Sequence, residues 1–445
     1  MTTGVERTVH GEPSFETRRL PLRVALLGFG TVGQAVARIL LERADLPDRL
    51  QLTHIFNRNV ARKRVSWTPA TLSWTDRIDD VLASEPDVIV EAVGGVEPAA
   101  EWVRRALSEG ISVVTANKLL MAAHAPELMA LAAASGARIR FEAAVAGGVP
   151  IIDALRSGLA GDHFTRVVGI LNGTCNFILS RMTDGDTMAD ALADAQRRGY
   201  AEADPSSDLD GHDAAAKLVL LAGVAFCLHV KTVDLPTGSI RDIDAIDFRY
   251  AARLGGTIRQ LAMVESAGAG RLQAFVGPAL VPESSSFARN KGAQNLVMVT
   301  GRYGGATTFG GEGAGGHPTA VAIVSDLLAL ARQERRAEPG DAAWLPGVID
   351  AAPARPYYLR FVVRDRPGIL AAITAALARH EINVDAVLQE PGFPKDRLPF
   401  VVTVEPCEET ALHAAIRDIV AEDFHAVPPL VMPVLPGEDH LAAVQ

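Results

Sequence analysis

The sequence is poor in cysteine, with only Cys175, Cys227 and Cys407 among its 445 residues. These lie far apart and form neither a CxxC pair nor a Cys/His cluster, so the sequence argues against a disulfide framework and a structural zinc site. Positive charge is also scarce, since 43 basic residues stand against 53 acidic ones. Charge therefore gives no reason to expect a nucleic-acid or an anionic-membrane partner.

Long hydrophobic runs are absent as well. No stretch approaches the roughly 18 consecutive apolar residues of a membrane span, and residues 1–20 lack the apolar run of a signal peptide. We expect residues 1–20 to form a polar lead-in, and we expect a cytoplasmic protein whose partner is a small metabolite. At this length a single hydrophobic core is insufficient, so two or three domains are expected.

Strand and helix signals alternate in the amino-terminal part of the chain, where short apolar runs occupy 22–28, 50–56, 87–95 and 111–118. This alternation predicts an α/β protein with a parallel sheet covered by helices. A GxGxxG motif directly follows the first predicted strand and opens a helix, as a dinucleotide-binding turn requires. The alternative is a glycine-rich turn without a ligand. The motif consists of Gly28, Phe29, Gly30, Thr31, Val32 and Gly33.

The second predicted strand ends in "FNRNVARKR", residues 56–64, which contains no acidic residue. An NAD enzyme usually places an aspartate or glutamate there to bind the ribose hydroxyls. Arg58 and Lys63 could instead pair with a 2′-phosphate, so the sequence favours NADP, with NAD as the other possibility. The competing interpretation is a solvated basic helix face.

The predicted domain organisation follows from these patterns. We assign residues 21–150 to a Rossmann-type NAD(P)-binding domain and residues 151–318, which have longer helical segments, to a second α/β domain. A helix at about 319–335 is expected to pack back on the first domain. Residues 338–356, rich in Pro, Ala, Gly and Asp, are the expected linker. Residues 357–433 have the strand and helix order of a small ferredoxin-like unit.

The stretch "EADPSSDLDGHDAAAK", residues 202–217, combines many carboxylates with one lysine. Asp213 and Lys217 are four residues apart, a spacing that places both side chains on one face of a helix. The acids could hold a substrate amine while the lysine exchanges a proton with an alcohol or aldehyde as hydride moves to a nicotinamide. A surface ion pair, simple solvation, or a Ca²⁺ or Mg²⁺ loop remain as alternatives, although the EF-hand spacing is absent. The upstream acids are Glu202, Asp204, Asp208 and Asp210.

Taken together, the motifs resemble the homoserine dehydrogenase family over about residues 22–330. The matching segments appear in the family's order: "GFGTVG", "TANK", "FEAAVAGGVPI", "ILNGTCNFILSRM", "GYAEADPSSDLDGHDAAAKL" and "GEGAGGHPTA". The resemblance implies NAD(P)-dependent interconversion of L-homoserine and L-aspartate 4-semialdehyde, on the route to threonine, methionine and isoleucine. It also implies a homodimer or homotetramer.

The resemblance further implies roles for individual residues. Lys217 is expected to be the proton donor or acceptor, with Asp213 as its partner. Glu202 and Asp208 are expected to hold the amino and hydroxyl ends of the substrate. Lys118 of "TANK" is expected to reach toward substrate and nicotinamide.

Two glycine-containing loops also gain roles from the resemblance. Gly313 is expected to lie in a turn that closes over the cofactor. "FEAAVAGGVP" resembles the family's monovalent-cation loop, which implies a Na⁺ site. Its expected ligands are Glu142 and the main-chain carbonyls of Val145, Gly147 and Val149.

The carboxy-terminal unit resembles an ACT domain, a module that senses amino acids. Its expected ligand loop is "RDRPGIL", residues 364–370, in which Gly368 allows close backbone approach at a helix start, with Asn383 on the following strand. The resemblance suggests L-threonine as effector. The alternative is a dimerisation module without a ligand, because fold alone does not determine function.

Two other functions are compatible with parts of the sequence. Cys175 in "NGTCNF" could be the nucleophile of a semialdehyde dehydrogenase that forms a thioester, although no histidine lies in the same motif. The chain could instead be a catalytically silent sensor of NADP and an amino acid.

Overall fold

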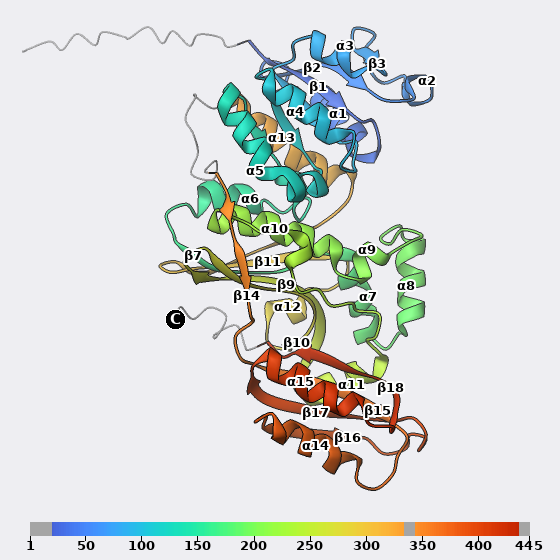
Figure 1. Ribbon diagram of the computed structural model, residues 1–445. Helices are drawn as coiled ribbons and strands as arrows, with labels where there is room; N and C mark the ends of the chain where they lie inside the picture. The colour runs from blue at the N-terminus through green and yellow to red at the C-terminus, as the bar shows by residue number, and fades with distance from the viewer. Residues whose placement is uncertain (1–19, 333–342, 436–445) are drawn as a thin grey trace, which may run out of the picture.

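The computed structural model describes residues 20–332 and 343–435, which form three stacked layers (Figure 1). The predicted lead-in lies outside the described residues, apart from Leu20. The upper layer contains a parallel sheet, the middle layer a mixed sheet, and the lower layer an antiparallel sheet. The predicted α/β fold class is confirmed.

The upper layer contains six parallel strands in the order β3-β2-β1-β4-β5-β6. Its central strands are short apolar runs buried on both faces, as expected of a sheet covered by helices. The strands are β1 (Leu22–Leu27), β2 (Leu50–Phe56), β3 (Ser73–Thr75), β4 (Val88–Glu91), β5 (Ser112–Thr115) and β6 (Ile139–Arg140). The helices nearby in sequence are α1 (Thr31–Glu42), α2 (Val60–Lys63), α3 (Ile78–Ala83), α4 (Ala99–Ser108) and α5 (Lys118–Ser135).

Helix α13 (Gly316–Arg332) joins this layer from far along the chain and lies beside α1 (Figure 1). Its buried residues Ile323 and Leu327 share one apolar cluster with Val24 of β1 and Val36 of α1. The segment expected to form a helix at 319–335 therefore packs on the first domain, and its residues 333–335 lie outside the described residues.

The middle layer is a mixed sheet in the order β12-β11-β7-β9-β10-β14, in which neighbours are antiparallel except β10 and β14. Its strands are β7 (Phe164–Ile170), β9 (Gly256–Gly268), β10 (Arg271–Pro282), β11 (Gln294–Gly301), β12 (Gly305–Glu312) and β14 (Val348–Asp350). Its helices are α6 (Ile151–Asp153), α7 (Gly173–Thr183), α8 (Met188–Arg197), α9 (Ser206–Leu209), α10 (His212–Phe226), α11 (Ala245–Arg253) and α12 (Ser286–Arg289).

One apolar cluster joins the upper and middle layers. Leu120 and Leu128 of α5 belong to it together with Leu218 and Leu221 of α10. This packing holds α5 against α10.

The sequence predicts a linker at 338–356, but the described part of this segment, 343–356, contains short strands. Leu345–Pro346 forms β13, which pairs with β8 (Leu228–His229), and β14 extends the mixed sheet beside β10. Trp344 is buried against Gly223 of α10. Composition suggested a linker, but part of this segment pairs and packs with the middle layer. Residues 338–342 lie outside the described residues.

The lower layer has the ferredoxin-like order β16-β17-β15-β18, with all neighbours antiparallel. Side chains alternate along β15, so Leu359 and Phe361 pack in the cluster under the two helices while Tyr358 faces a cluster shared with α11. The elements are β15 (Arg355–Val363), α14 (Ile369–Arg379), β16 (Val384–Gln389), β17 (Leu398–Cys407), α15 (Glu409–Val420) and β18 (His425–Pro433).

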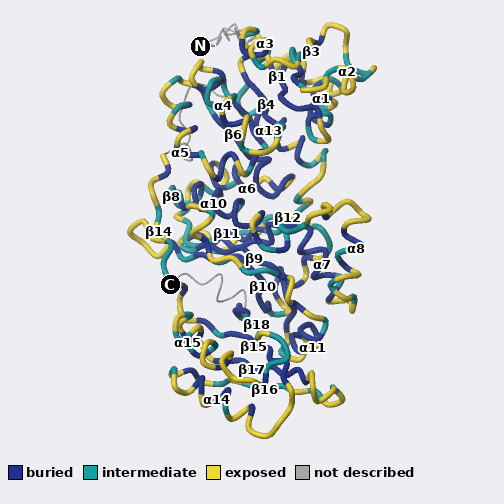
Figure 2. Tube along the Cα trace, turned by 45° about the vertical axis from the view of Figure 1, so that its right-hand side comes forward, coloured by how far each residue is buried: buried dark blue, intermediate teal, exposed yellow. Residues whose placement is uncertain are grey.

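Burial follows the same layers. Figure 2 shows buried chain along the sheets and exposed chain on outward elements such as α2. Among the described residues, no helix combines the length and the apolar character that a membrane crossing requires.

Candidate active site

The glycine-rich turn between β1 and α1 has the geometry of a phosphate-binding turn. Gly28 has a φ of +97°, and a Cβ there would lie 2.5 Å from the carbonyl oxygen of Ala92. A Cβ on Gly33 would lie 2.1 Å from the carbonyl oxygen of Gly28, so this position needs glycine for close packing. Gly30 is the N-cap residue of α1, and a Cβ there would have no atom from another part of the chain within 4 Å. A pyrophosphate can approach the backbone there.

The rest of this motif is divided between core and surface. Phe29 is fully buried and contacts the rings of Trp67 and Trp74, so its side chain anchors the turn in the hydrophobic core. Thr31 and Val32 start α1. The turn lies where strand order reverses, because β1 has β2 on one side and β4 on the other. Nucleotides bind at such a switch point in open α/β sheets.

The basic segment after β2 lies at the same edge of the sheet. Arg58 and Lys63 are exposed, and among the described residues neither forms an ion pair. The neighbouring Arg62 and Arg64 are exposed too. Free cations next to the second strand fit a 2′-phosphate.

A buried carboxylate that the sequence analysis missed fixes the loop carrying Lys118. Glu91 ends β4, is fully buried, and accepts hydrogen bonds from Thr115 Oγ1 at 2.5 Å and from the amide nitrogen of Val93 at 2.8 Å. Thr115 Oγ1 in turn accepts a bond from the amide of Asn117, and the Asn117 side chain caps α5. Only the topology reveals this network, because Glu91 and Thr115 lie on adjacent strands.

Two lysines converge on one carboxylate. Lys217 Nζ lies 2.7 Å from Asp213 Oδ2, and Lys118 Nζ lies 2.7 Å from Asp213 Oδ1. Lys217 Nζ also donates to the carbonyl oxygen of Leu171 at 2.8 Å. The sequence predicted the Asp213–Lys217 pair from helical spacing, whereas Lys118 arrives from the start of α5. The structure therefore brings all three predicted catalytic residues together.

The charges of this cluster stabilise one another. Burial alone would raise the pKa of Asp213, but Lys217 and Lys118 outweigh it and hold that pKa well below its usual range. Burial likewise opposes the charge of Lys118, yet Asp213 raises the pKa of Lys118 above its ordinary value, with smaller help from Asp208 and Glu202. The carboxylate is thus ionised and the Lys118 amine protonated at neutral pH.

The other upstream acids have different environments. Asp208 is half-buried, and burial raises its pKa. Glu202 is exposed and lies close enough to influence Lys118 electrostatically. Asp204 accepts hydrogen bonds from Ser206, and Asp210 pairs with Arg241 at 2.8 Å. Asp204 and Asp210 are thus held by neighbouring side chains, whereas Glu202 and Asp208 both act electrostatically on Lys118.

Asn172 links two of these acids. Its Nδ2 donates to Asp208 Oδ1 at 2.7 Å and to Asp213 Oδ2 at 2.8 Å. Its Oδ1 accepts a bond from the amide of Cys175 and caps α7. The sequence analysis quoted "ILNGTCNFILSRM" but did not single out Asn172.

The loop with Gly313 is held against the active site. The side chain of Asn295 lies against Gly313, where a Cβ would meet Asn295 Cγ at 2.1 Å. Asn295 Nδ2 donates to the same Leu171 carbonyl that Lys217 binds. A Cβ on Gly147, which has a φ of +56°, would lie 2.4 Å from the Gly313 carbonyl oxygen. The expected cation loop and cofactor loop therefore touch each other.

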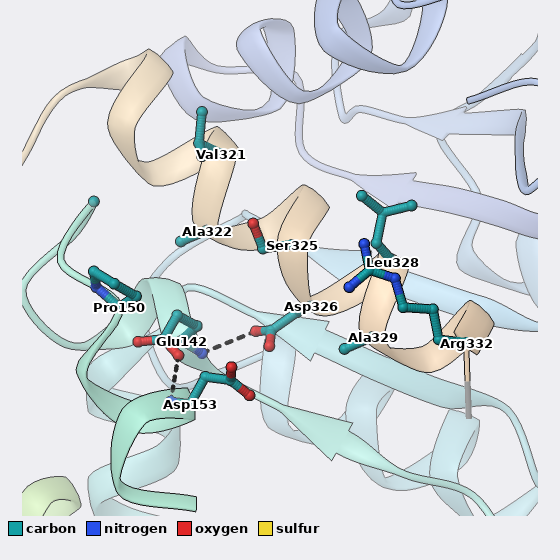
Figure 3. A pocket seen from close by; sticks show the side chains of 11 residues that line it. Glu142, Pro150, Asp153, Val321, Ala322, Ser325, Asp326, Leu328, Ala329 and Arg332 are labelled. Atoms are coloured by element: carbon teal, nitrogen blue, oxygen red, sulfur yellow. Dashed lines mark hydrogen bonds between the residues drawn. The ribbon is translucent and has the colours of Figure 1, made fainter. Parts of the chain in front are cut away.

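Glu142 lies close to the carboxylates of Asp153 and Asp326 (Figure 3), and the buried Arg140 pairs with both of them. Its carboxylate accepts hydrogen bonds from the amides of Ile152 at 2.9 Å and Asp153 at 2.6 Å, and its own amide donates to Asp326. Burial, with the charge of Asp326, raises the pKa of Glu142 to about 8. A cavity of about 370 Å³ adjoins these residues.

Among the expected cation ligands, only Glu142 would bind through its side chain. Among the described residues, His, Cys, Asp and Glu do not gather into a group of three that could hold a metal ion. The expected set relies mainly on the carbonyls of Val145, Gly147 and Val149, and hard cations accept such ligands. A cation beside the Glu142 carboxylate would offset its repulsion from Asp326.

Cys175 lies beside the cluster but is fully buried. Its Sγ donates to the carbonyl oxygen of Asp208 at 3.1 Å, and burial raises the pKa of the thiol well above its usual value. A reactive cysteine needs the opposite shift, so this environment disfavours a thiolate nucleophile.

The two predicted regulatory residues lie in different places. Gly368, with a φ of +97°, starts α14 and lines a cavity of about 150 Å³ together with Asp365, Arg366 and Val387. Asn383 is exposed and donates to Glu405 at 3.1 Å, and it is not among the residues that line this cavity. Asn383 precedes β16, whereas the cavity adjoins the later part of that strand.

Comparisons with protein families agree with this geometry. Residues 28–142 match the family described as "Homoserine dehydrogenase, NAD binding domain", and residues 150–328 match "Homoserine dehydrogenase". Residues 357–423 match "ACT domain". The resemblance inferred from the motifs is confirmed.

Relatives match over most of the chain. The homoserine dehydrogenase of Mycobacterium tuberculosis is 41% identical over 384 residues, 83% of this chain and 87% of that protein. The crystal structure of a homoserine dehydrogenase from Thiobacillus denitrificans has a TM-score of 0.84 and 37% identity, covering 93% of this chain and 98% of the other. A hyperthermophilic archaeal homoserine dehydrogenase in complex with NADPH has a TM-score of 0.61 and 28% identity, covering 71% of this chain and all of the other. The chain belongs to the homoserine dehydrogenase family and is an NAD(P)-dependent oxidoreductase with an ACT domain.

Proposed function

We propose that the chain interconverts L-homoserine and L-aspartate 4-semialdehyde with Lys217 as proton donor and acceptor. The observation that carries this proposal is the set of hydrogen bonds made by Lys217 Nζ. Among the described residues, two of its three N–H donors are used, by Asp213 and by the Leu171 carbonyl. The third is available to a substrate oxygen.

The proton transfer follows from this arrangement. In the reductive direction, Lys217 donates one proton to the aldehyde oxygen as the aldehyde carbon accepts a hydride, and the product is the alcohol. In the oxidative direction, neutral Lys217 takes the hydroxyl proton as the hydride leaves the same carbon. The cofactor, when bound, would supply that hydride as NADPH in the reductive direction and accept it as NADP⁺ in the oxidative direction. Asp213 fixes the position of Lys217 through the 2.7 Å contact between Lys217 Nζ and Asp213 Oδ2.

Lys118 and the neighbouring acids orient the substrate. Lys118, which is more exposed than Lys217, presents its ammonium from the start of α5 on the opposite side of Asp213. Glu202 and Asp208 hold the amino and hydroxyl ends of homoserine. A substrate ammonium offsets the charge of these carboxylates, which no arginine or lysine within the described residues neutralises by an ion pair.

We assign the choice between NADP and NAD to the basic segment after β2. The open space at Gly30 accommodates a pyrophosphate, and Arg58 with Lys63 binds a 2′-phosphate, so NADP is preferred to NAD. The archaeal relative of known structure is in complex with NADPH, which supports this assignment.

A monovalent cation, Na⁺, is assigned to Glu142 and the carbonyls of Val145, Gly147 and Val149. The buried carboxylate beside Asp326 supports this assignment, and Gly147 packs against Gly313. The cation's role is to hold the two loops in the arrangement that the cofactor requires.

The ACT domain is proposed to bind L-threonine and inhibit the enzyme. The cavity beside Gly368 supports this proposal, because backbone groups at a helix start and the side chains of Asp365 and Arg366 can meet an amino acid's charged groups. We also propose a homodimer or homotetramer and a place in threonine, methionine and isoleucine biosynthesis.

The proposed function is tested by following reduced-nicotinamide absorbance with purified protein and L-homoserine. We expect homoserine-dependent reduction that is faster with NADP than with NAD and is slowed by L-threonine. Binding of NADP without any homoserine-dependent reduction would instead indicate the silent sensor. Equal rates with both cofactors would contradict the role of Arg58, and an unchanged rate with threonine would contradict the proposed effector.

A further inference from the structure

The side-chain amide of Asn172 hydrogen-bonds to both Asp208 and Asp213. Its orientation is fixed at the other end, because Oδ1 accepts the amide hydrogen of Cys175 at 2.8 Å. The NH₂ group must therefore face the carboxylates, where the same nitrogen donates to both. Asn172 is 4% exposed, so water does not replace these bonds readily.

We propose that Asn172 is a positioning residue for the reaction, which holds Asp208 and Asp213 at a set separation and thereby aims Lys217 at the substrate. Two carboxylates that share one neutral donor can approach each other with less repulsion than bare carboxylates. Asp213 then keeps an oxygen for each lysine, with Oδ1 on Lys118 and Oδ2 on Lys217. The inference rests on the proposed role of Lys217.

The backbone around Asn172 supports this role. The carbonyl oxygen of the preceding residue, Leu171, accepts a hydrogen bond from Lys217 Nζ. The carbonyl oxygen of Asp208 accepts bonds from Cys175 Sγ and from Gln260 Nε2 at 3.3 Å. A shift of Asn172 would therefore disturb both the acids and the lysine. Among the described residues, Lys118, Lys217 and Cys175 interact electrostatically with Asp208 and Asp213, and Glu202 acts on Lys118.

Substitutions can separate this role from the capping of α7. Aspartate and serine are good helix caps, so Asn172→Asp and Asn172→Ser keep a side-chain acceptor for Cys175. Asn172→Asp removes both N–H donors and adds a third carboxylate, which repels Asp208 and Asp213. Asn172→Ser is neutral and shorter and has one donor where asparagine has two.

The test compares kcat, KM and the pH profile of wild type, both variants and Lys217→Ala, with thermal unfolding as the measure of folding. We expect Asn172→Asp to lower kcat by about 10²-fold. It should also move the acid limb of kcat/KM upward by about one pH unit, because repulsion raises the carboxylate pKa values. Asn172→Ser should lose at least about tenfold in kcat without that pH shift. NADP binding should stay unchanged in both.

Two outcomes distinguish the inference from the proposed function. If both Asn172 variants keep the wild-type kcat and pH profile while Lys217→Ala is inactive, Asn172 is only a helix cap and the inference fails. If Lys217→Ala is fully active, the proposed proton transfer itself fails. If the aspartate variant does not fold, the serine variant decides, and wild-type turnover in it overturns the inference.

Discussion

At the scale of single residues, the site depends on which charges are satisfied inside the protein. Asp204 and Asp210 are bound by Ser206 and Arg241, whereas Glu202 and Asp208 have no ion-pair partner among the described residues. Helical spacing alone predicted the Asp213–Lys217 pair. It could not predict Asn172, because its two acceptors lie on separate elements about forty residues further along the chain.

Arg58 gives the residue-scale prediction about the cofactor. Arg58→Glu should weaken NADP binding at least about tenfold, or ~1.4 kcal/mol, because it replaces a cation with an anion beside the 2′-phosphate. NAD binding should change much less. The measurement is a fluorescence titration of each reduced cofactor. Arg77→Glu is the matched control, since Arg77 is exposed in the same layer and pairs with Asp80. Equal losses for NADP and NAD would contradict the assignment.

At the scale of elements, the ACT sheet is attached to α11 through a buried polar contact. Asp247 of α11 is fully buried, accepts a hydrogen bond from Tyr358 at 2.8 Å and pairs with Arg360 at 3.0 Å. Tyr250 also donates to the carbonyl oxygen of Pro399. A composition-based linker at 338–356 suggested a separable module, but pattern analysis cannot detect contacts between residues more than a hundred positions apart.

This contact predicts a large loss of stability on substitution. Asp247→Ala should destabilise the fold by about 3–5 kcal/mol, because Arg360 would remain buried without its carboxylate. Urea unfolding measures the change. Arg379→Ala should change the midpoint little, since its pair with Asp418 is exposed. Equal midpoints for the Asp247 variant and wild type would show that the two layers are not energetically connected.

At the scale of the whole molecule, the candidate active site lies where the upper and middle layers meet. Lys118 comes from the first, and Asp213 and Lys217 come from the second, while the apolar cluster containing Leu120 and Leu218 holds the two helices together. The sequence predicted the fold class and the lysine-bearing motifs, because local periodicity and turn chemistry are legible in single segments. The buried Glu91 network and the ACT attachment depend on tertiary contacts, which local patterns do not specify.

The most direct test of the central claim is the turnover number of Lys217→Ala with L-homoserine and NADP. The account predicts a fall in kcat of about 10²- to 10⁴-fold with cofactor binding intact. Lys291→Ala is the control and should match wild type, because its pair with Asp184 lies at the opposite end of α7 from Asn172. An unchanged kcat in Lys217→Ala would contradict proton transfer by this lysine.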